Sequence, residues 1–214
     1  MVALAGKRPR ILLADDHALM LDGFCSLLEP NYEVAGTAAN GQELVEAARL
    51  LKPDLIILDI TMPLLNGIDA ALLIRKDLPQ VKLLFVTMHT SPTYLRAALE
   101  AGANGYAVKS SGRAEILAAV ETVLSGTRYI TPGVGGDRLE HLPDPARAAA
   151  SLRLSARERQ ILQLTAEGRS RKEVAHTLGI SEKTVAFHKN NLTRKLGLRS
   201  TAQLTRYALE EGLI

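Results

Sequence analysis

Short apolar runs recur along the first 130 residues, and amphipathic stretches separate them. Five of these runs have the composition of strands, at residues 10–16, 32–38, 54–60, 82–88 and 105–109. The residues Leu55, Ile56, Ile57 and Leu58 do not alternate with polar ones, which is typical of a strand buried on both faces. Strands that alternate with helices predict a parallel sheet covered on both faces, so we expect an α/β domain here.

The intervening stretches have the period and the end signals of helices. They occupy residues 18–28, 42–51, 67–76, 92–102 and 113–126. Asn40 and Glu43 have capping-box-like spacing at the start of the second stretch. Pro92 begins the fourth stretch and Gly102 ends it, as helices prefer. These signals support the alternation of strands and helices.

The pattern changes after residue 130. Residues 131–151 contain three Pro and three Gly without a sustained period, which predicts a linker. Helical periodicity then resumes, with Ser155 and Glu158 at capping-box spacing and Ser181 as the expected cap of a later helix. We therefore expect three parts, which are an α/β domain at 8–128, a linker at 129–151 and a small all-α four-helix domain at 152–214.

The charge is divided unevenly between these parts. The chain has a net charge of +3, but residues 1–150 carry 14 Lys/Arg and 17 Asp/Glu, whereas residues 151–214 carry 12 and 6. A basic second domain favours a polyanionic partner such as double-stranded DNA. The alternative is a basic surface that is merely solvated.

The sequence lacks the signals of disulfide-bonded, secreted or membrane-spanning proteins. The single cysteine, Cys25, has no partner for an internal disulfide, and no Cys/His cluster predicts zinc. The N-terminus lacks the apolar region of a signal peptide, and no uncharged apolar run reaches the ~18 residues of a membrane span. We expect a cytoplasmic protein with no membrane partner.

Polar side chains stand where the predicted strands end. Asp15 and Asp16 close the first strand, and Asp59, Thr87 and Lys109 close the third, fourth and fifth. The carboxyl ends of parallel strands meet at one edge of the sheet. Three carboxylates in one site require a proton or a cation, and Mg²⁺ suits carboxylate oxygens.

This set of side chains has the chemistry for phosphoryl transfer to a carboxylate. A metal ion and a lysine neutralise phosphoryl oxygens, and a hydroxyl donates to them. The alternative is that each residue is ordinary, since Asp and Thr at strand ends often cap the next helix.

The second domain contains two helices joined by a short turn at Gly179. This spacing is typical of a helix-turn-helix, whose second helix enters the major groove. On that second helix, the positions away from the predicted core are Lys183, Ala186, Lys189, Asn190 and Arg194. Lys and Arg suit phosphates, and Asn pairs with adenine. The alternative is an amphipathic bundle helix with a wet polar face.

Together, Asp15–Asp16, "LDITMP" around Asp59, Thr87 and "GYAVK" with Lys109 resemble a response-regulator receiver domain. The resemblance implies a flavodoxin-like, doubly wound, five-stranded sheet of order 2-1-3-4-5. It implies that a sensor histidine kinase phosphorylates Asp59. The implied Mg²⁺ ligands are Asp15, Asp16, Asp59 and the backbone carbonyl of Thr61.

The same resemblance assigns further roles. Thr87 and Lys109 would bind the phosphoryl oxygens, and Tyr106 would be the aromatic switch that follows Thr87. Thr61 and His89 lie two residues after Asp59 and Thr87, and we expect both to modulate the lifetime of the phosphate. The alternative for His89 is a loop residue with no role in this chemistry. Many receivers have Pro after the lysine, often with a cis bond, whereas Ser110 stands here.

The string "LSARERQILQLTAEGRSRKEVAHTLGISEKTVAFHKNNLTRKLGLRS" resembles the LuxR-type DNA-binding domain of NarL/FixJ response regulators. The resemblance makes 181–196 the recognition helix and 200–211 a dimer interface on DNA. Ala186 stands where many members carry a polar base reader, which leaves Asn190 as the main one. The implied backbone contacts are Arg171, Lys172, Lys183, Thr184 and Lys189.

We therefore expect a DNA-binding transcriptional response regulator rather than an enzyme. Phosphorylation of Asp59 would switch dimerisation and promoter binding through the fourth helix, fifth strand and fifth helix. One alternative is an enzyme of the phosphotransferase or phosphatase class that uses the same Asp, Mg²⁺ and Lys. The other is a phosphorylation-independent transcription factor with a vestigial receiver.

Overall fold

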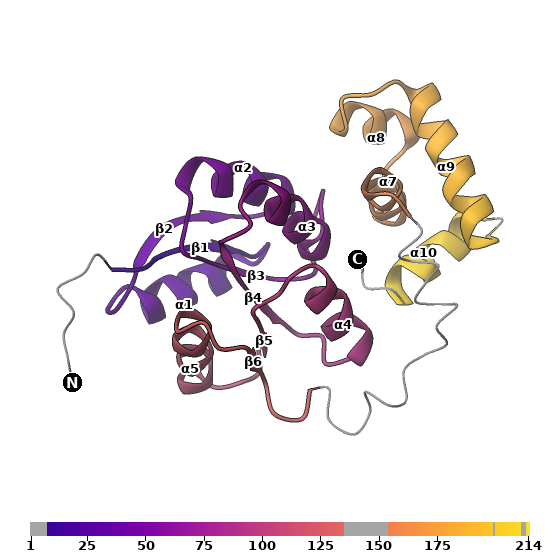
Figure 1. The fold of residues 1–214 in the computed structure, drawn as a ribbon. Helices are drawn as coiled ribbons and strands as arrows, with labels where there is room; N and C mark the ends of the chain where they lie inside the picture. The colour runs from indigo at the N-terminus through magenta and orange to yellow at the C-terminus, as the bar shows by residue number, and fades with distance from the viewer. Residues whose placement is uncertain (1–7, 135–153, 199, 211–212) are drawn as a thin grey trace.

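The computed structural model describes residues 8–134, 154–198, 200–210 and 213–214, and Figure 1 shows an α/β domain beside a helical domain. Parallel strands of the first domain form one sheet of order β2-β1-β3-β4-β5-β6. The strands are β1 (Arg10–Ala14), β2 (Glu33–Ala38), β3 (Leu55–Leu58), β4 (Lys82–Thr87), β5 (Gly105–Val108) and β6 (Tyr129–Ile130). The helices between them are α1 (Ala18–Leu28), α2 (Gly41–Leu51), α3 (Gly67–Asp77), α4 (Pro92–Glu100) and α5 (Arg113–Leu124).

The sixth strand differs from the prediction of five. The order of the first five strands is confirmed, and β6 pairs with β5 through Gly105–Tyr129 and Tyr106–Ile130. Two residues are too short for a periodic signal, so the sequence pattern missed this strand. The sheet therefore reaches into residues that were predicted to be linker, and residues 135–151 of that segment lie outside the described chain.

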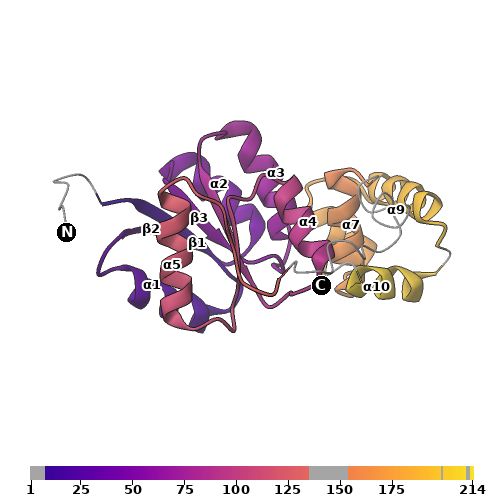
Figure 2. The same ribbon diagram turned by 60° about the horizontal axis from the view of Figure 1, so that its bottom comes forward.

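The two faces of the sheet have separate cores. Helices α2, α3 and α4 cover one face and α1 and α5 cover the other, as Figures 1 and 2 show. In β3, Ile56 and Leu58 belong to the first core, and Leu55 and Ile57 belong to the second. Each is at most 2% exposed. Burial on both faces explains why β3 has no polar alternation, and it fixes the position of Asp59 at its end.

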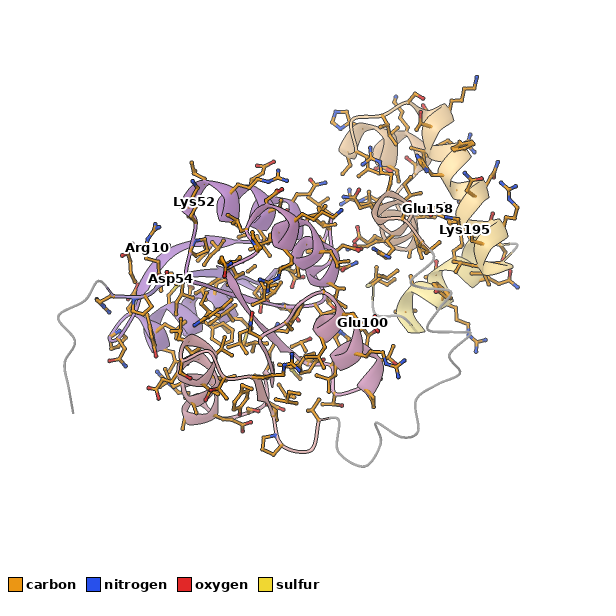
Figure 3. All side chains as sticks on the ribbon, in the orientation of Figure 1. Arg10, Lys52, Asp54, Glu100, Glu158 and Lys195 are labelled. Carbon is orange, nitrogen blue, oxygen red and sulfur yellow. The ribbon has the colours of Figure 1, made fainter. Side chains whose placement is uncertain are left out.

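The helical domain contains α7 (Ala156–Ala166), α8 (Arg171–Thr177), α9 (Glu182–Leu196) and α10 (Thr201–Glu210). The predicted capping box of Ser155 and Glu158 is confirmed. Glu158 also accepts a hydrogen bond from Lys195 at 2.7 Å, which ties α7 to the end of α9 (Figure 3). Ser181 caps α9 as expected, and its hydroxyl accepts from the Thr184 backbone N–H. Among the described residues, no helix has the length and apolarity to cross a membrane.

Contacts between the domains involve α7 and the chain that follows β3. The Nε atom of Arg159 lies 2.5 Å from the Asp69 carboxylate, and Gln163 donates to the carbonyl of Met62 at 2.6 Å. Leu64 packs against the core of the helical domain. The loop that begins at Asp59 therefore touches both domains.

Candidate functional site

Asp15, Asp59 and Lys109 meet at the carboxyl edge of the sheet. Each directly follows a strand, β1, β3 or β5. The ammonium of Lys109 lies 2.7 Å from Asp15 and 2.6 Å from Asp59. The two Asp residues are only 2% and 6% exposed. The predicted convergence of these three side chains is therefore present, with one cation between two carboxylates.

Lys109 stays charged in this position. Burial opposes its charged form, but the hydrogen bonds that its ammonium donates to Asp15 and Asp59 outweigh that cost and raise its pKa. Two carboxylates with a single lysine still leave one negative charge uncompensated. That balance favours an additional cation at the site.

Asp16 and His17 form the outer rim of the site. The side chain of Asp16 is 31% exposed, and its carboxylate lies 2.9 Å from His17 Nδ1. His17 is the exposed N-cap of α1. The backbone N–H of His17 donates to Asp15 at 3.0 Å, which ties the residue before α1 to the site.

The donor set fits Mg²⁺. The oxygens of Asp15 and Asp16 lie within 4.8 Å of each other and of a His17 nitrogen. Asp59 joins them through Lys109, so hard carboxylate oxygens dominate the site, as Mg²⁺ prefers. Thr61 is half-buried two residues after Asp59, and the role of its carbonyl remains a prediction.

The backbone around Asp59 is tightly constrained. Its carboxylate accepts from the Ile60 backbone N–H at 2.6 Å, and the Gly67 N–H donates to the Ile60 carbonyl at 2.8 Å. A Cβ atom at Gly67 would lie 1.9 Å from the Asp59 carbonyl oxygen. Only glycine fits there. Sequence reasoning did not single out Gly67, although Asn-Gly before a helix is a recognisable turn signal.

A hydrogen-bonded chain connects the predicted switch and lifetime residues. Thr61 Oγ1 lies 2.9 Å from His89 Nε2, and Tyr106 donates its hydroxyl to the His89 carbonyl at 2.8 Å. The backbone N–H of His89 donates to Thr87 at 3.4 Å. The ring of His89 stacks on Tyr94 with centroids 4.0 Å apart. These residues therefore form one connected group beside Asp59.

Protonation within this group follows from burial. Desolvation lowers the pKa of His89, with Asp59 opposing and Lys109 reinforcing the shift. The imidazole is therefore neutral at pH 7. Tyr106 is fully buried, and desolvation raises the pKa of its hydroxyl, so that the hydroxyl remains a donor. No cis peptide bond occurs in the described chain, including the bond before Ser110.

Asp69 and its partners at the domain contact were missed by sequence reasoning. Asp69 is 1% exposed, accepts from Asn66 Nδ2 at 2.9 Å, and pairs with Arg159. Burial raises the pKa of its carboxyl, while Arg159 and Asn66 oppose that shift. A cavity of about 190 Å³ adjoins the pair, and Tyr94, Glu100 and Leu213 are among its lining residues. An Asp at the third position of a helix normally indicates capping of that helix. Its pairing with Arg159 of the other domain was therefore not predictable from the sequence.

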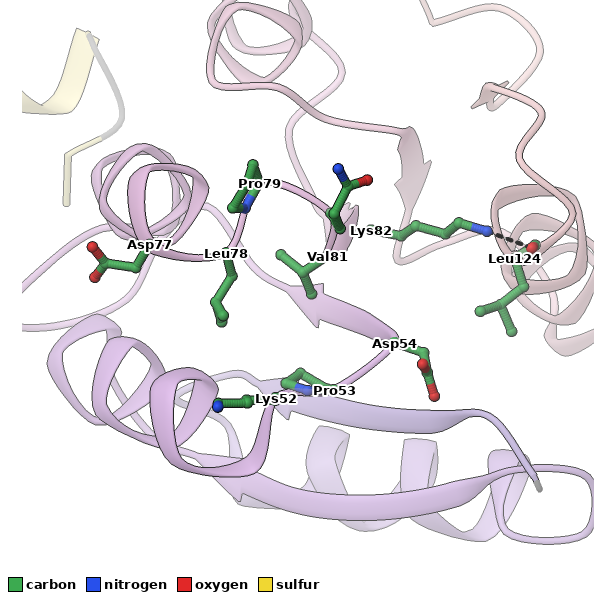
Figure 4. Close-up of a pocket in the computed structure, with 10 residues that line it drawn as sticks. Lys52, Pro53, Asp54, Asp77, Leu78, Pro79, Val81, Lys82 and Leu124 are labelled. Carbon is green, nitrogen blue, oxygen red and sulfur yellow. Dashed lines mark hydrogen bonds between the residues drawn. The ribbon is translucent and has the colours of Figure 1, made fainter.

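A larger cavity lies at the other end of the sheet. Figure 4 shows this cavity, of about 390 Å³, between Asp54 before β3, Asp77 at the end of α3, and Lys82 at the start of β4. Lys82 donates to the Leu124 carbonyl. Asp59 and Thr87 stand at the opposite ends of these two strands. The larger cavity is therefore separate from the predicted phosphorylation site.

The helix α9 presents its predicted polar face to solvent. Val185 and Leu192 are buried, and Leu196 packs partly buried against the same core. The exposed residues among the predicted DNA contacts are Arg171, Lys172, Lys183, Asn190 and Arg194, whereas Thr184, Ala186 and Lys189 are half-buried. Phe187, which the sequence reading passed over, is 61% exposed on the same helix.

On α10, the apolar positions divide between two sides. Leu204 and Ala208 are buried in the core of the helical domain, whereas Leu209 is 59% exposed. Ala202 and Arg206 are also exposed, at spacings that place them near Leu209 on one side of the helix. This side of α10 is available for the predicted dimer contact.

Comparison with family models identifies both domains. Residues 11–121 match the response regulator receiver domain. Residues 152–208 match the bacterial regulatory proteins of the luxR family. The two matched regions correspond to the α/β and the helical domain.

Two relatives match over nearly the whole chain. The transcriptional regulatory protein MctR of Rhizobium johnstonii is 43% identical over 216 residues, covering 97% of each chain. The oxygen regulatory protein NreC of Staphylococcus carnosus is 36% identical over 219 residues, covering 96% of this chain and 99% of the relative. The similarity therefore extends through both domains.

Solved structures agree with this architecture. The RcsB response regulator of Salmonella typhimurium covers 96% of this chain and 99% of its own, with 26% identity and a TM-score of 0.64. A LuxR-family response regulator from Aurantimonas covers 63% of this chain and 98% of its own, with 36% identity and a TM-score of 0.60. This chain belongs to the two-component response regulators that join a receiver domain to a luxR-type DNA-binding domain, a family of transcription regulators rather than enzymes.

Proposed function

We propose that a sensor histidine kinase phosphorylates Asp59 and that this switches promoter binding by the helical domain in the cytoplasm. The observation that carries the proposal is the position of Lys109, which lies within 2.7 Å of both Asp15 and Asp59. The ammonium of a lysine held there pairs with the carboxylate before phosphorylation and can pair with the phosphoryl oxygens afterwards.

The carboxylates of this site have different roles. Asp59 is the nucleophile in this proposal. The Ile60 N–H holds its Oδ1 and Lys109 contacts its Oδ2, so the carboxylate is fixed in orientation. Asp15 and Asp16, with the carbonyl of Thr61, would hold Mg²⁺. When bound, that ion neutralises charge on the phosphoryl group. Thr87 supplies a hydroxyl to a phosphoryl oxygen.

The signal passes from Asp59 through the residues around His89. Movement of Thr87 toward the phosphoryl group pulls on the His89 backbone, which Thr87 and Tyr106 both hold by hydrogen bonds. Tyr106 is already buried in this structure. Thr61 and His89 flank the phosphoryl position and control the approach of water.

The loop after β3 offers a route to the helical domain. Thr61 contacts His89, while Met62 and Leu64 contact α7 and the helical core. A phosphoryl group on Asp59 displaces this loop and weakens the contact. This route differs from the expected one through α4, β5 and α5, although α4 lines the adjoining cavity.

DNA binding and dimerisation complete the proposal. The exposed face of α9 enters the major groove of promoter DNA, and α10 joins two copies through the side that carries Leu209. Support comes from the solved RcsB of Salmonella enterica serovar Typhimurium, which was bound to a promoter in the presence of the phosphomimetic BeF3−. That structure is 26% identical, covers 94% of this chain and 98% of its own, and has a TM-score of 0.60.

Phosphoryl transfer from a small donor such as acetyl phosphate tests the chemistry directly. With Mg²⁺, the wild-type chain should become labelled and Asp59→Asn should not. Asp77→Asn, which removes an exposed carboxylate at the other end of the sheet, should label like the wild type. Equal labelling of Asp59→Asn and wild type would refute Asp59 as the acceptor. If the wild-type chain is labelled but Asp59→Asn regulates its promoter as the wild type does, the vestigial-receiver alternative is supported.

A further inference from the structure

Phe187 is exposed, unlike the other phenylalanines of the chain. The other two phenylalanines, Phe24 and Phe85, are 8% and 0% exposed, whereas Phe187 is 61% exposed. Its ring meets His188 edge-on with centroids 5.6 Å apart, and this contact leaves most of the ring in water. Keeping a phenyl ring in solvent forgoes the stabilisation of burial. The exposed ring is therefore a feature that folding alone does not explain.

The position of Phe187 on α9 places it between charged residues. Lys183, Phe187, Asn190 and Arg194 follow one another at spacings of four, three and four residues, which puts them in one stripe along the helix. All four are exposed, while Val185 on the other side is 2% exposed. Two cations thus stand at the ends of the stripe, and an aromatic ring and an amide stand at its centre.

This arrangement separates backbone contacts from base contacts. The cations at the ends suit phosphates on either side of a groove, and the central pair then faces the base edges. Phe187 and Asn190 are about 4.5 Å apart along the helix axis, close to the rise of about 3.4 Å per base pair. Asn pairs with adenine, and an apolar side chain such as Phe contacts the methyl group of thymine.

We infer that Phe187 recognises a thymine methyl group in the major groove, next to the base pair that Asn190 reads. The inference rests on the proposed insertion of α9 into DNA. It adds Phe187 to the predicted contacts of α9, because Phe187 is 61% exposed on this helix whereas Ala186 is half-buried. The recognised half-site therefore contains an A·T-rich step.

The receiver leaves this stripe accessible. In Figures 1 and 2, α9 lies on the side of the helical domain that faces away from the sheet, and α7 lies between them. Phe187 is 61% exposed with both domains present, so the receiver does not cover its ring. The thymine contact thus needs no rearrangement of the helical domain itself.

Replacing thymine by deoxyuridine removes only the methyl group and tests the inference. A binding site is first selected from random duplexes with the full-length chain in beryllofluoride and Mg²⁺. Affinity is then measured with each thymine of that site replaced in turn. At one position per half-site, the wild type should lose affinity about fourfold, the factor expected for burial of one methyl group.

Variants assign that loss to the ring. Phe187→Ala should bind thymine and uracil duplexes equally, whereas Phe187→Leu should keep part of the difference. Leu50→Ala, which removes an exposed apolar side chain from α2, should behave like the wild type. Binding of all variants to random DNA at low salt should stay within about twofold of the wild type, which confirms that they are folded.

Two results would overturn the inference, and they are distinguishable. If Phe187→Ala keeps the same thymine-to-uracil ratio as the wild type at every position, Phe187 does not read the methyl group, and DNA binding itself stands. If the wild-type chain selects no sequence and binds no DNA, the proposed function fails together with the inference.

Discussion

The guanidinium of Arg159 lies 2.5 Å from the carboxylate of Asp69 and joins α7 of the helical domain to α3 of the receiver. Both side chains are largely buried, with exposures of 17% and 1%. Removing one partner of such a pair while the domains stay docked leaves the other charge buried and unpaired, which is costly. The pair, together with Gln163 and Met62, therefore resists separation of the domains.

Arg159→Ala should weaken the docking of the domains. The lost interaction is a charged hydrogen bond, worth about 2 kcal/mol, which shifts the docking equilibrium by about thirtyfold. Small-angle X-ray scattering should then report a larger radius of gyration for the unphosphorylated chain. Arg157→Ala, which removes an arginine of α7 that donates within its own domain, is the matched control. Equal radii for both variants and wild type would rule out a docking role for Arg159.

His89→Ala should change the lifetime of the phosphate severalfold. The imidazole is held beside Asp59 by Thr61 Oγ1 and by stacking on Tyr94, where it restricts an attacking water. The rate of dephosphorylation follows from the decay of labelled protein. His176→Ala, an exposed histidine of α8, should decay like the wild type. An unchanged half-life in His89→Ala would remove this residue from the account.

Asn190→Ala and Lys189→Ala should affect DNA binding in different ways. Loss of the amide should erase discrimination among sites, because a base contact carries sequence information. Loss of the ammonium should weaken all sites together and reduce the salt slope by about one. Binding isotherms at several salt concentrations separate the two effects. An equal loss at every site in both variants would contradict the assigned roles.

Leu209→Asp should reduce dimerisation on DNA. A charge at this exposed position of α10 opposes apolar contact between two copies, while the buried Leu204 keeps the helix in place. Sedimentation of protein–DNA complexes should shift from two copies per site toward one. Leu50→Asp, on α2, is the control. Two copies per site in Leu209→Asp would place the dimer contact elsewhere.

Much of this arrangement was predictable from local patterns. The buried run of β3, the strand ends at Asp15, Asp59 and Lys109, and the caps at Ser155 and Ser181 each follow from periodicity or end signals. These features depend on neighbours in sequence, which a pattern records. The order of the first five strands followed from the family resemblance.

The features that were missed depend on contacts between distant segments. Asp69 and Arg159 are 90 residues apart, and Gln163 and Met62 are 101 apart, so no local pattern pairs them. β6 is too short to carry a period. The exposure of Phe187 depends on how α9 packs in its domain, because one apolar residue in an amphipathic helix normally indicates core.

The central claim is that the state of Asp59 controls DNA binding. The most direct test measures operator affinity and oligomeric state of the full chain with and without beryllofluoride and Mg²⁺. The account predicts tighter operator binding and a dimer with the phosphoryl mimic, and neither change in Asp59→Asn. Identical affinity and oligomeric state under both conditions would contradict the switch.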